Sequence, residues 1–454
     1  MTQAKRGKSG GTDKPQTPHR EPAGGTGSLE AAMAAEKNPI RRFLKVLGPG
    51  FISGAADDDP SGIGTYATAG ASLGYATLWT ALLTFPLMAA VQLVCAKIGM
   101  VTGKGLAGVL RQHYPRRMLY AAVIALFVAN TINVGADLAA IAAAINLLVP
   151  ALPIAPLVLP IALGILALQI RGSYRLIARI FKWLTLALFA YIGSAFFARP
   201  DWGQVLGATF IPTIRVDQTF LLTLVAILGT TISPYLFFWQ ATQEVEEEMS
   251  MGRTQLWRRK GATDNELKYA ALDVNVGMGF SILVMYFIML ATAATLHVAG
   301  KTDIKSATDA AEALRPLAGD LSSVLLAVGL IGSGVLAVPI LSCSAAYALS
   351  EAFGWRYGLD RNPARAKQFY MVIVAGTLVG VGIDYLGINP IDALFFTAVI
   401  NGFVAPPLLV MIMLVSNNKT IMGKRTNSRL TNVLGWGAAV VMFVAAGVLL
   451  VASL

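Results

Sequence analysis

Long apolar segments, each about as long as a bilayer-spanning helix, recur along the whole chain. A helix rises 1.5 Å per residue, so about 20 apolar residues cross the hydrocarbon core. Only 13% of the 454 residues are charged, against roughly 25% in soluble domains. The sequence therefore predicts an all-α polytopic membrane protein. Eleven apolar regions are expected as transmembrane helices 1–11: residues 48–74 (interrupted), 78–100, 119–148, 155–168, 177–197, 219–243 (interrupted), 274–296, 321–347, 369–383, 391–415 and 434–454.

The distribution of basic residues predicts how these helices are oriented. The net charge is +11, and most Lys and Arg residues lie in the N-terminal tail and in the connections after helices 2, 4, 6, 8 and 10. Such an excess marks cytoplasmic connections. We therefore expect a multi-pass protein of the cell membrane with a cytoplasmic N-terminus and an extracytoplasmic C-terminus, and no nucleic-acid partner. The opposite connections contain only Arg199, Arg215, Lys301, Lys305 and Arg315.

The chain is expected to divide into four parts. Residues 1–44 are rich in Gly, Lys, Thr, Pro and Ala without apolar periodicity, which predicts a disordered cytoplasmic tail. Residues 45–200 contain helices 1–5 and residues 201–415 contain helices 6–10. Residues 416–454 supply a cytoplasmic connection and helix 11. The expected partners are the lipid bilayer and a transported solute, and a monomer is expected.

Two of the helices are interrupted at corresponding places. Helix 1 is broken at residues 59–62 (Asp-Pro-Ser-Gly) and helix 6 at Ser233-Pro234. Proline has no N–H and frees backbone carbonyls, which lipid tolerates only where they line a cavity or a ligand. A single break would as readily be a simple kink. Two halves of five helices, each opening with a broken helix, predict an inverted 5+5 repeat of the LeuT/APC type with helix 11 added.

Three consecutive acids adjoin the first break. A carboxylate inside a membrane is costly and usually functional. Asp57, Asp58 and Asp59 lie about 100° apart around a helix, so they cannot all face one point. Asp59 adjoins the break and is predicted to be the central ligand, whereas Asp57 and Asp58 are expected to line the entry path or to bond neighbouring helices. With freed carbonyls and the Ser233 hydroxyl, Asp59 gives an oxygen-only set that suits hard cations such as Mg²⁺ or Mn²⁺.

Helices 3 and 10 contribute weaker polar signals. Asp137 in helix 3 could relay protons or cations, or could pair with a helical Arg or Lys, and the sequence favours neither. Asn133 and Asn130 lie one and two turns before it on the same face, which predicts a polar stripe toward the cavity. Asn401 in helix 10 is expected either to line this cavity or, more readily, to bond another helix.

The inner half of helix 6 carries further polar residues. Gln240 and Trp239 are candidates for an inner gate. The acidic run from Glu244 to Glu248 is interpreted as a solvated face rather than an ion-gathering surface. No histidine falls within a predicted membrane core, so the usual proton carrier at physiological pH is missing there.

At this point the motifs show a resemblance to a known family. "GPGFISGAADDDPSG" resembles helix 1 of the NRAMP family of divalent-metal transporters, whose break reads Asp-Pro-Gly-Asn, and "TTISPYLFFWQA" resembles its helix 6, whose break reads Met-Pro-His. "GADLA" in helix 3 and the proline-bearing helix 10 match in place, and the resemblance covers residues 45–454. It implies that the metal-binding aspartate is Asp59 and that the carbonyl ligand is on Thr230. The family's asparagine ligand falls on Gly62 and its methionine on Ser233.

The departures from the family pattern are as informative as the matches. A thioether favours soft transition metals, so serine in its place removes the selective ligand. Gly62 is expected to leave room for a water molecule beside the metal. Tyr235 replaces the family's histidine and Ala140 replaces an acid, which argues against proton coupling. The combination is similar to the NRAMP-related magnesium transporters of prokaryotes, so we expect import of Mg²⁺ and also Mn²⁺ as substrates, without a cofactor.

Three alternatives stay open beside this reading. The first is a proton-coupled Mn²⁺ or Fe²⁺ symporter of the same family. The second is a transporter of amino acids or other solutes with the same fold, although three acids before the break would repel a carboxylate. The third is a membrane-embedded enzyme or structural subunit, which we do not expect because no nucleophile–base pair or ligand cluster is evident.

Overall fold

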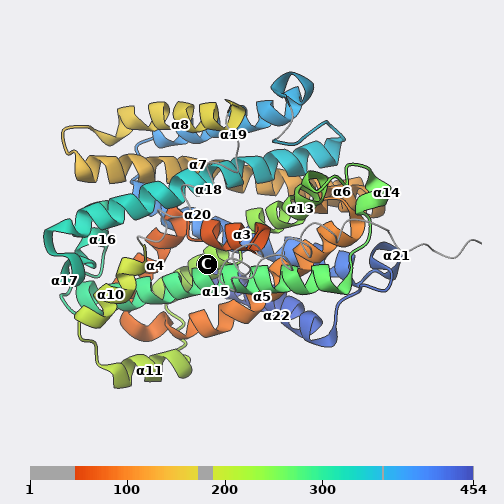
Figure 1. The fold of residues 1–454 in the computed structure, drawn as a ribbon. Coiled ribbons are helices and arrows are strands. Elements are labelled where there is room, and N and C mark those ends of the chain that lie inside the picture. Colours follow the sequence, from red (N-terminus) through yellow and green to blue (C-terminus); the bar gives the residue numbers. More distant parts are fainter. Residues whose placement is uncertain (1–46, 172–187, 360–361, 453–454) are drawn as a thin grey trace, which may run out of the picture.

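The protein is helical throughout the part described by a computed structural model, which comprises residues 47–171, 188–359 and 362–452 (Figure 1). Helix 1 comprises α3 (Pro49–Asp57) and α4 (Pro60–Leu73), and helix 6 comprises α12 (Gln218–Thr231) and α13 (Pro234–Ser250). The other helices are α5 (Trp79–Thr102), α6 (Leu106–His113), α7 (Arg116–Leu148), α8 (Ile154–Arg171), α10 (Ala190–Phe197), α11 (Trp202–Phe210), α14 (Leu256–Arg259), α15 (Asp264–Thr292), α16 (Ala307–Glu312), α17 (Arg315–Ala318), α18 (Ser322–Phe353), α19 (Lys367–Asp384), α20 (Pro390–Asn417), α21 (Lys419–Met422) and α22 (Arg429–Ala452).

Nine segments of the described chain are long and apolar enough to cross a membrane. Helix 1 is not among them, and it consists of two helices of 9 and 14 residues. The expected helix 5 lies mostly outside the described residues, and only α10 at its end is seen. The tail of residues 1–44 also lies outside them. The all-helical class is confirmed, while the count of eleven spans stays a prediction.

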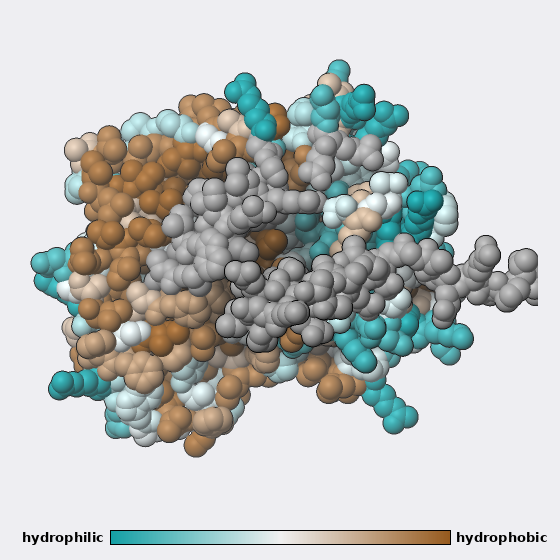
Figure 2. All heavy atoms as spheres, viewed as in Figure 1, coloured by the Kyte–Doolittle hydropathy of each residue, from teal (hydrophilic) through white to brown (hydrophobic). Residues whose placement is uncertain are grey.

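The surface is apolar along the helices and polar at their ends. Figure 2 shows hydrophobic residues over much of the left-hand part of one face, and hydrophilic residues mainly at the right-hand end. Figure 1 places α6, α14 and α21 at that end. These elements follow helices 2, 6 and 10, so three basic connections lie together. On α22, Val440, Phe443 and Val444 are among the large apolar side chains that are exposed, as a lipid-facing surface requires.

The two broken helices lie in the interior, between the other helices. α3 packs on α15, while α4 packs on α15, α20 and α12. α13 packs on α5 and α18. The α12–α20 contact is especially close, because a Cβ atom added at Gly229 would lie 2.1 Å from the carbonyl oxygen of Ala398. This packing brings the residues at both breaks into one buried region.

Candidate metal centre

Both predicted helix interruptions are present. α3 ends at Asp57 and α4 begins at Pro60, while α12 ends at Thr231 and α13 begins at Pro234. Each proline occupies the first turn of the following helix, where its missing N–H has no partner to lose. The breaks therefore form because each proline can start a helix but cannot continue one.

Asp59 forms the turn at the break of helix 1 and still offers an oxygen to a ligand. Its Oδ1 accepts the backbone N–H of Gly62 and the hydroxyl of Ser61, each at 2.7 Å, which caps α4. Among the described residues, its Oδ2 has one long hydrogen-bond contact, 3.5 Å, with the hydroxyl of Tyr235. The side chain is 1% exposed. One carboxylate oxygen is thus fixed by the turn, and the other can meet a cation.

The break of helix 6 supplies neutral oxygens. The Ser233 hydroxyl donates to the carbonyl oxygens of Thr230 at 2.5 Å and Gly229 at 3.1 Å. A hydroxyl has one proton but two lone pairs, and a carbonyl also has two lone pairs, so both oxygens keep acceptor capacity for a cation. The buried Thr230 hydroxyl has no hydrogen-bond partner among the described residues. The predicted ligands Thr230 and Ser233 therefore lie together.

The two breaks face each other. A Cβ atom added at Gly62 would lie 3.3 Å from the Thr230 hydroxyl oxygen and 3.1 Å from the carbonyl oxygen of Asp57. From the other side, the Tyr235 hydroxyl donates to the carbonyl oxygen of Ala56 at 2.8 Å. The structure thus brings the expected helix 1 residues next to the expected helix 6 residues. The space beside Gly62 is narrow in this conformation, so the water expected there needs its neighbours to move apart.

Asp57 and Asp58 bond to a neighbouring helix. Both side chains are fully buried. The Ser281 hydroxyl, on α15, lies 2.7 Å from Asp57 Oδ2 and 3.2 Å from Asp58 Oδ1. The other oxygen of each carboxylate has no hydrogen-bond partner within the described chain. Of the two expectations for these acids, bonding to another helix is the one observed. Sequence reasoning missed Ser281, whose only signal is a hydroxyl in an apolar helix.

Asp137 on α7 lies near Asp59 without a basic partner. It interacts electrostatically with Asp59 and with Asp384. Both of its carboxylate oxygens are buried without a hydrogen-bond partner among the described residues, and no Lys or Arg pairs with it there. For the described chain, the expected alternative of a helical Arg or Lys partner is therefore wrong.

The predicted asparagine stripe is only partly seen. Asn130 donates to the carbonyl oxygen of Leu341 on α18 at 2.9 Å, which is an interhelical bond. Neither polar atom of the Asn133 side chain has a partner in the described ranges. The side-chain nitrogen of Asn401 likewise has no hydrogen-bond partner there, so this nitrogen does not donate to another helix. Asn133 and Asn401 stay candidates for the cavity.

The inner half of helix 6 is more buried than expected. Gln240 accepts the Ser53 hydroxyl at 2.6 Å and donates to Glu244 at 2.8 Å. Glu244 and Glu248 are each only 6% exposed, so the interpretation of this run as a solvated face is wrong for both. They are buried because α13 packs against α5 and α18. Trp239 packs against the ring of Tyr347.

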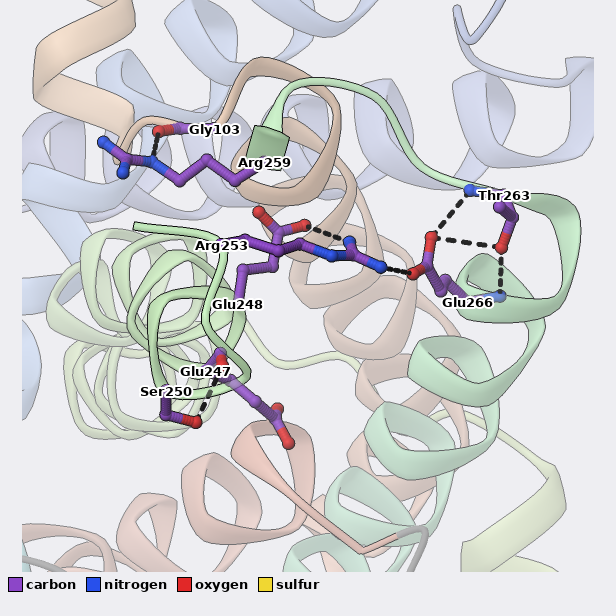
Figure 3. A network of polar contacts seen from close by, with 8 residues as sticks. All are labelled: Gly103, Glu247, Glu248, Ser250, Arg253, Arg259, Thr263 and Glu266. Carbon is purple, nitrogen blue, oxygen red and sulfur yellow. Dashed lines mark hydrogen bonds and ion pairs between the residues drawn. The ribbon is translucent and has the colours of Figure 1, made fainter. Parts of the chain in front are cut away.

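A polar network lies at the C-terminal end of α13 (Figure 3). Arg253, in the connection after α13, lies 3.6 Å from Glu248 and 2.5 Å from Glu266 on α15. Arg259 donates to the carbonyl oxygen of Gly103 at 2.9 Å, just after α5. The connection thus joins the ends of α13, α15 and α5, and it supplies the partner of Glu248.

The described residues contain no group of three or more His, Cys, Asp or Glu side chains arranged to hold a metal ion. A cation between the breaks would therefore be held by the single carboxylate of Asp59 together with neutral oxygens. This chemistry suits a hard ion that keeps part of its water shell.

An all-helical membrane protein with two broken helices meeting beside a buried acid has the architecture of an alternating-access transporter. Solved structures agree at the level of the fold. The Eremococcus coleocola manganese transporter superposes with a TM-score of 0.70 at 19% identity, covering 90% of this chain and 87% of that one. A nucleobase-cation-symport-1 family transporter reaches 0.57 at 11% identity, covering 90% and 92%.

The sequence then gives the family. Residues 50–452 match the family described as Natural resistance-associated macrophage protein-like, and the chain belongs to it. A divalent metal cation transporter, MntH, of Deinococcus radiodurans is 27% identical over 447 residues, covering 96% of each chain. The MntH protein of Bacillus subtilis is 26% identical over 421 residues, covering 91% of this chain and 94% of its own. The predicted family is confirmed, and these relatives are named transporters, not enzymes.

Proposed function

We propose that this protein imports divalent metal cations across the cell membrane by alternating access, with Mg²⁺ as the main cargo and Mn²⁺ also carried, without proton coupling. The main support is the position of Asp59, a buried carboxylate that faces the sulfur-free break of helix 6. The names of the relatives support divalent cations as the substrate class.

The proposed cation ligands are all oxygens. Asp59 Oδ2 supplies the charge, while the Thr230 carbonyl and the Ser233 hydroxyl supply neutral donors. Mg²⁺ prefers oxygen ligands and gives up its water shell reluctantly, so it is bound by few protein groups. A hydrated ion requires a wider space beside Gly62, and we expect this space to widen when the site opens. Gly62 is thus proposed as the position of a metal-bound water.

The membrane potential supplies the driving force. A charge that crosses the membrane gains about 2.3 kcal/mol per 100 mV, and a divalent cation carries two. With the basic ends of the helices in the cytoplasm, as proposed from the charge distribution, uptake follows the potential and needs no proton. The Tyr235 hydroxyl supports this view, because it donates to a backbone carbonyl where the family has a titrating histidine.

One observation favours a second candidate, proton-coupled Mn²⁺ or Fe²⁺ symport. Asp137 is buried, lies near Asp59 and has no basic partner in the described chain. Such a carboxylate can hold a proton. Two relatives in the comparisons are also manganese and divalent metal transporters by name.

Metal flux into proteoliposomes with simultaneous recording of internal pH tests both candidates. The vesicles are given an inside-negative potassium diffusion potential, and Mg²⁺, Mn²⁺ and Fe²⁺ are supplied in turn. We expect Mg²⁺ and Mn²⁺ to enter faster as the potential grows, with no internal acidification. Acidification that follows metal entry would establish symport instead, and entry of Mn²⁺ without Mg²⁺ would refute the proposed cargo.

A thermal-shift measurement separates metal from organic solutes. The purified protein is heated with MgCl₂, with MnCl₂ and with a set of amino acids. We expect stabilisation by the two metals only, since a ligand that binds the folded state raises its apparent stability. Stabilisation by an amino acid alone would favour the solute alternative.

A further inference from the structure

The inner half of helix 1 is joined to α15 at its beginning. The Asp273 carboxylate, on α15, accepts the backbone N–H groups of Gly48 at 2.8 Å, Gly50 at 2.7 Å and Phe51 at 3.0 Å. No side chain of α3 itself caps this end. The first amides of a helix have no intrahelical partner and carry its positive dipole end. A carboxylate from another helix satisfies them here.

In the middle, the two helix backbones touch. A Cβ atom added at Gly50 would lie 2.6 Å from the backbone nitrogen of Val274, and one at Gly54 would lie 2.1 Å from the carbonyl oxygen of Gly277. A Cβ atom added at Gly277 would lie 2.3 Å from the carbonyl oxygen of Gly50. Small residues spaced four apart permit this close packing of membrane helices.

At the far end of α3, Ser281 of the same helix contacts the carboxylates of Asp57 and Asp58. α3 is therefore held by α15 at its first turn, along its length and at its last turn. A movement of α3 alone would expose three backbone amides and two carboxylates at once. Each unpaired polar group in this environment costs several kcal/mol.

The contact of α3 with α13 is different in kind. It depends on single hydrogen bonds, from Ser53 to Gln240 and from Tyr235 to Ala56. α13 is also bonded to α18, because the Ser344 hydroxyl of α18 donates to the Tyr235 carbonyl at 2.7 Å. We call the line of contact at Ser53 and Gln240 the inner seam.

We propose that Asp273 is a positioning residue that joins α3 to α15 as a single gate unit, so that the two helices move together when the path to the cytoplasm opens along the inner seam. The Ser53–Gln240 hydrogen bond breaks in this step, while the three bonds to Asp273 persist. At the cytoplasmic end, Arg253 in the connection after α13 contacts Glu266 on α15, and this contact has to yield too (Figure 3). This inference rests on the proposed transport function.

The opened seam has the chemistry of a cation path. Ser53 and Gln240 present a hydroxyl and an amide oxygen, and Glu244 follows one helical turn after Gln240. At the middle of the α3–α15 interface, glycine residues bring the two backbones into direct contact. A hydrated cation that leaves Asp59 therefore finds oxygen ligands on the α13 side of α3, whereas on the α15 side the Asp273 carboxylate and the Ser281 hydroxyl are already bonded to residues of helix 1.

Reversible cross-linking of two cysteine pairs tests the inference. In a background in which the buried Cys95 and Cys343 are replaced by Ala, one protein carries Ser53→Cys and Gln240→Cys across the seam. The matched protein carries Phe51→Cys and Phe280→Cys across the gate unit, where the rings now lie 5.8 Å apart. Mn²⁺ uptake into proteoliposomes is measured before oxidation, after oxidation and after reduction.

We expect oxidation to reduce uptake at least about tenfold for the seam pair and less than about twofold for the gate-unit pair, because only the first link blocks the opening step. Loss of uptake in the oxidised gate-unit protein would overturn the proposal, and so would unchanged uptake in the oxidised seam protein. If the unsubstituted protein carries no Mn²⁺ at all, the proposed function has failed rather than the gate.

Spin labels on the same two pairs give a readout that does not need transport. The 51–280 distance should stay constant between protein with and without Mg²⁺, and the 53–240 distance should broaden or lengthen in one of these states. A change confined to the 51–280 pair would contradict the proposal.

The role of Asp273 has its own test. Asp273→Ala should lower Mn²⁺ uptake, and oxidation of the 51–280 cysteine pair in the same protein should restore at least part of it. A folding defect would not be repaired by a link between these two helices. Unrescued loss would show that Asp273 does not act by joining them.

Discussion

The two helix breaks solve the same backbone problem in opposite ways. At the break of helix 1, the Asp59 side chain accepts the N–H of Gly62 in the helix that follows. At the break of helix 6, the Ser233 hydroxyl turns backward and satisfies carbonyl oxygens of the helix that precedes it. The first break carries a charge and the second carries none.

This difference predicts that the two breaks control different properties of cation binding, namely its strength and its selectivity. A charge decides whether a cation is bound at all, because taking a divalent ion out of water requires a compensating anion. Neutral donors decide which cation fits, through their hardness and geometry. Changes at helix 1 should therefore alter the strength of binding for all metals, and changes at helix 6 should alter the ratio between metals.

The largest effect is expected for Asp59→Asn. The substitution keeps the shape but removes the charge, and the loss of one partner of a buried charge pair costs about 3–5 kcal/mol. Uptake of Mg²⁺ and Mn²⁺ should both fall at least about 100-fold, since each 1.4 kcal/mol is a factor of ten. The exposed Asp303→Asn is the matched control. Normal uptake by the Asp59 variant would show that this carboxylate does not hold the ion.

A tenfold effect of another kind is expected for Ser233→Met. A thioether in place of the hydroxyl adds a soft ligand, so the ratio of Mn²⁺ to Mg²⁺ uptake should rise about tenfold. Ser233→Ala serves as control, since it removes the oxygen without adding sulfur. Competition between the two metals in the flux assay measures the ratio, and an unchanged ratio would mean that helix 6 does not set selectivity.

A smaller effect is expected for Tyr235→Phe. The loss of its hydrogen bond to Ala56 costs about 1 kcal/mol, or roughly fivefold in affinity. Because this bond joins the breaks without contacting the metal in our account, both metals should be affected equally. Calorimetric titration with Mn²⁺ and with Mg²⁺ measures the two losses. A selective loss for one metal would place Tyr235 among its ligands.

The smallest effect on uptake is expected for Ser281→Ala. It removes a hydroxyl shared by Asp57 and Asp58, outside the proposed ligand set. The free energy of unfolding should fall by about 1–3 kcal/mol, since buried carboxylate oxygens lose their donor. Uptake should change less than about twofold once the amount of folded protein is matched. A selective loss of Mg²⁺ transport would extend the metal centre to helix 7.

The sequence was sufficient for features that depend on the chain locally. Proline breaks follow from the geometry of one residue, and the apolar lengths follow from the bilayer, so both breaks and the helical class were predicted. The grouping of Asp59, Gly62, Thr230 and Tyr235 also followed, because the resemblance aligned both breaks.

Long-range partners could not be predicted in the same way. Asp273 and Ser281 are separated from their partners on α3 by more than 220 residues, and nothing local marks either one as a partner of helix 1. The burial of Glu244 and Glu248 was missed because an acidic run normally faces water. It depends on how α13 packs and on Arg253, which belongs to the next connection.

Anomalous scattering from crystals grown with Mn²⁺ locates the bound cation directly. If a single carboxylate between the two breaks holds the cargo, one strong peak should lie between α4 and α13. It should be within about 2–2.5 Å of an Asp59 oxygen if bound directly, or about 4 Å if a water intervenes. A peak elsewhere with the space beside Asp59 vacant, in protein that transports Mn²⁺, would contradict the account.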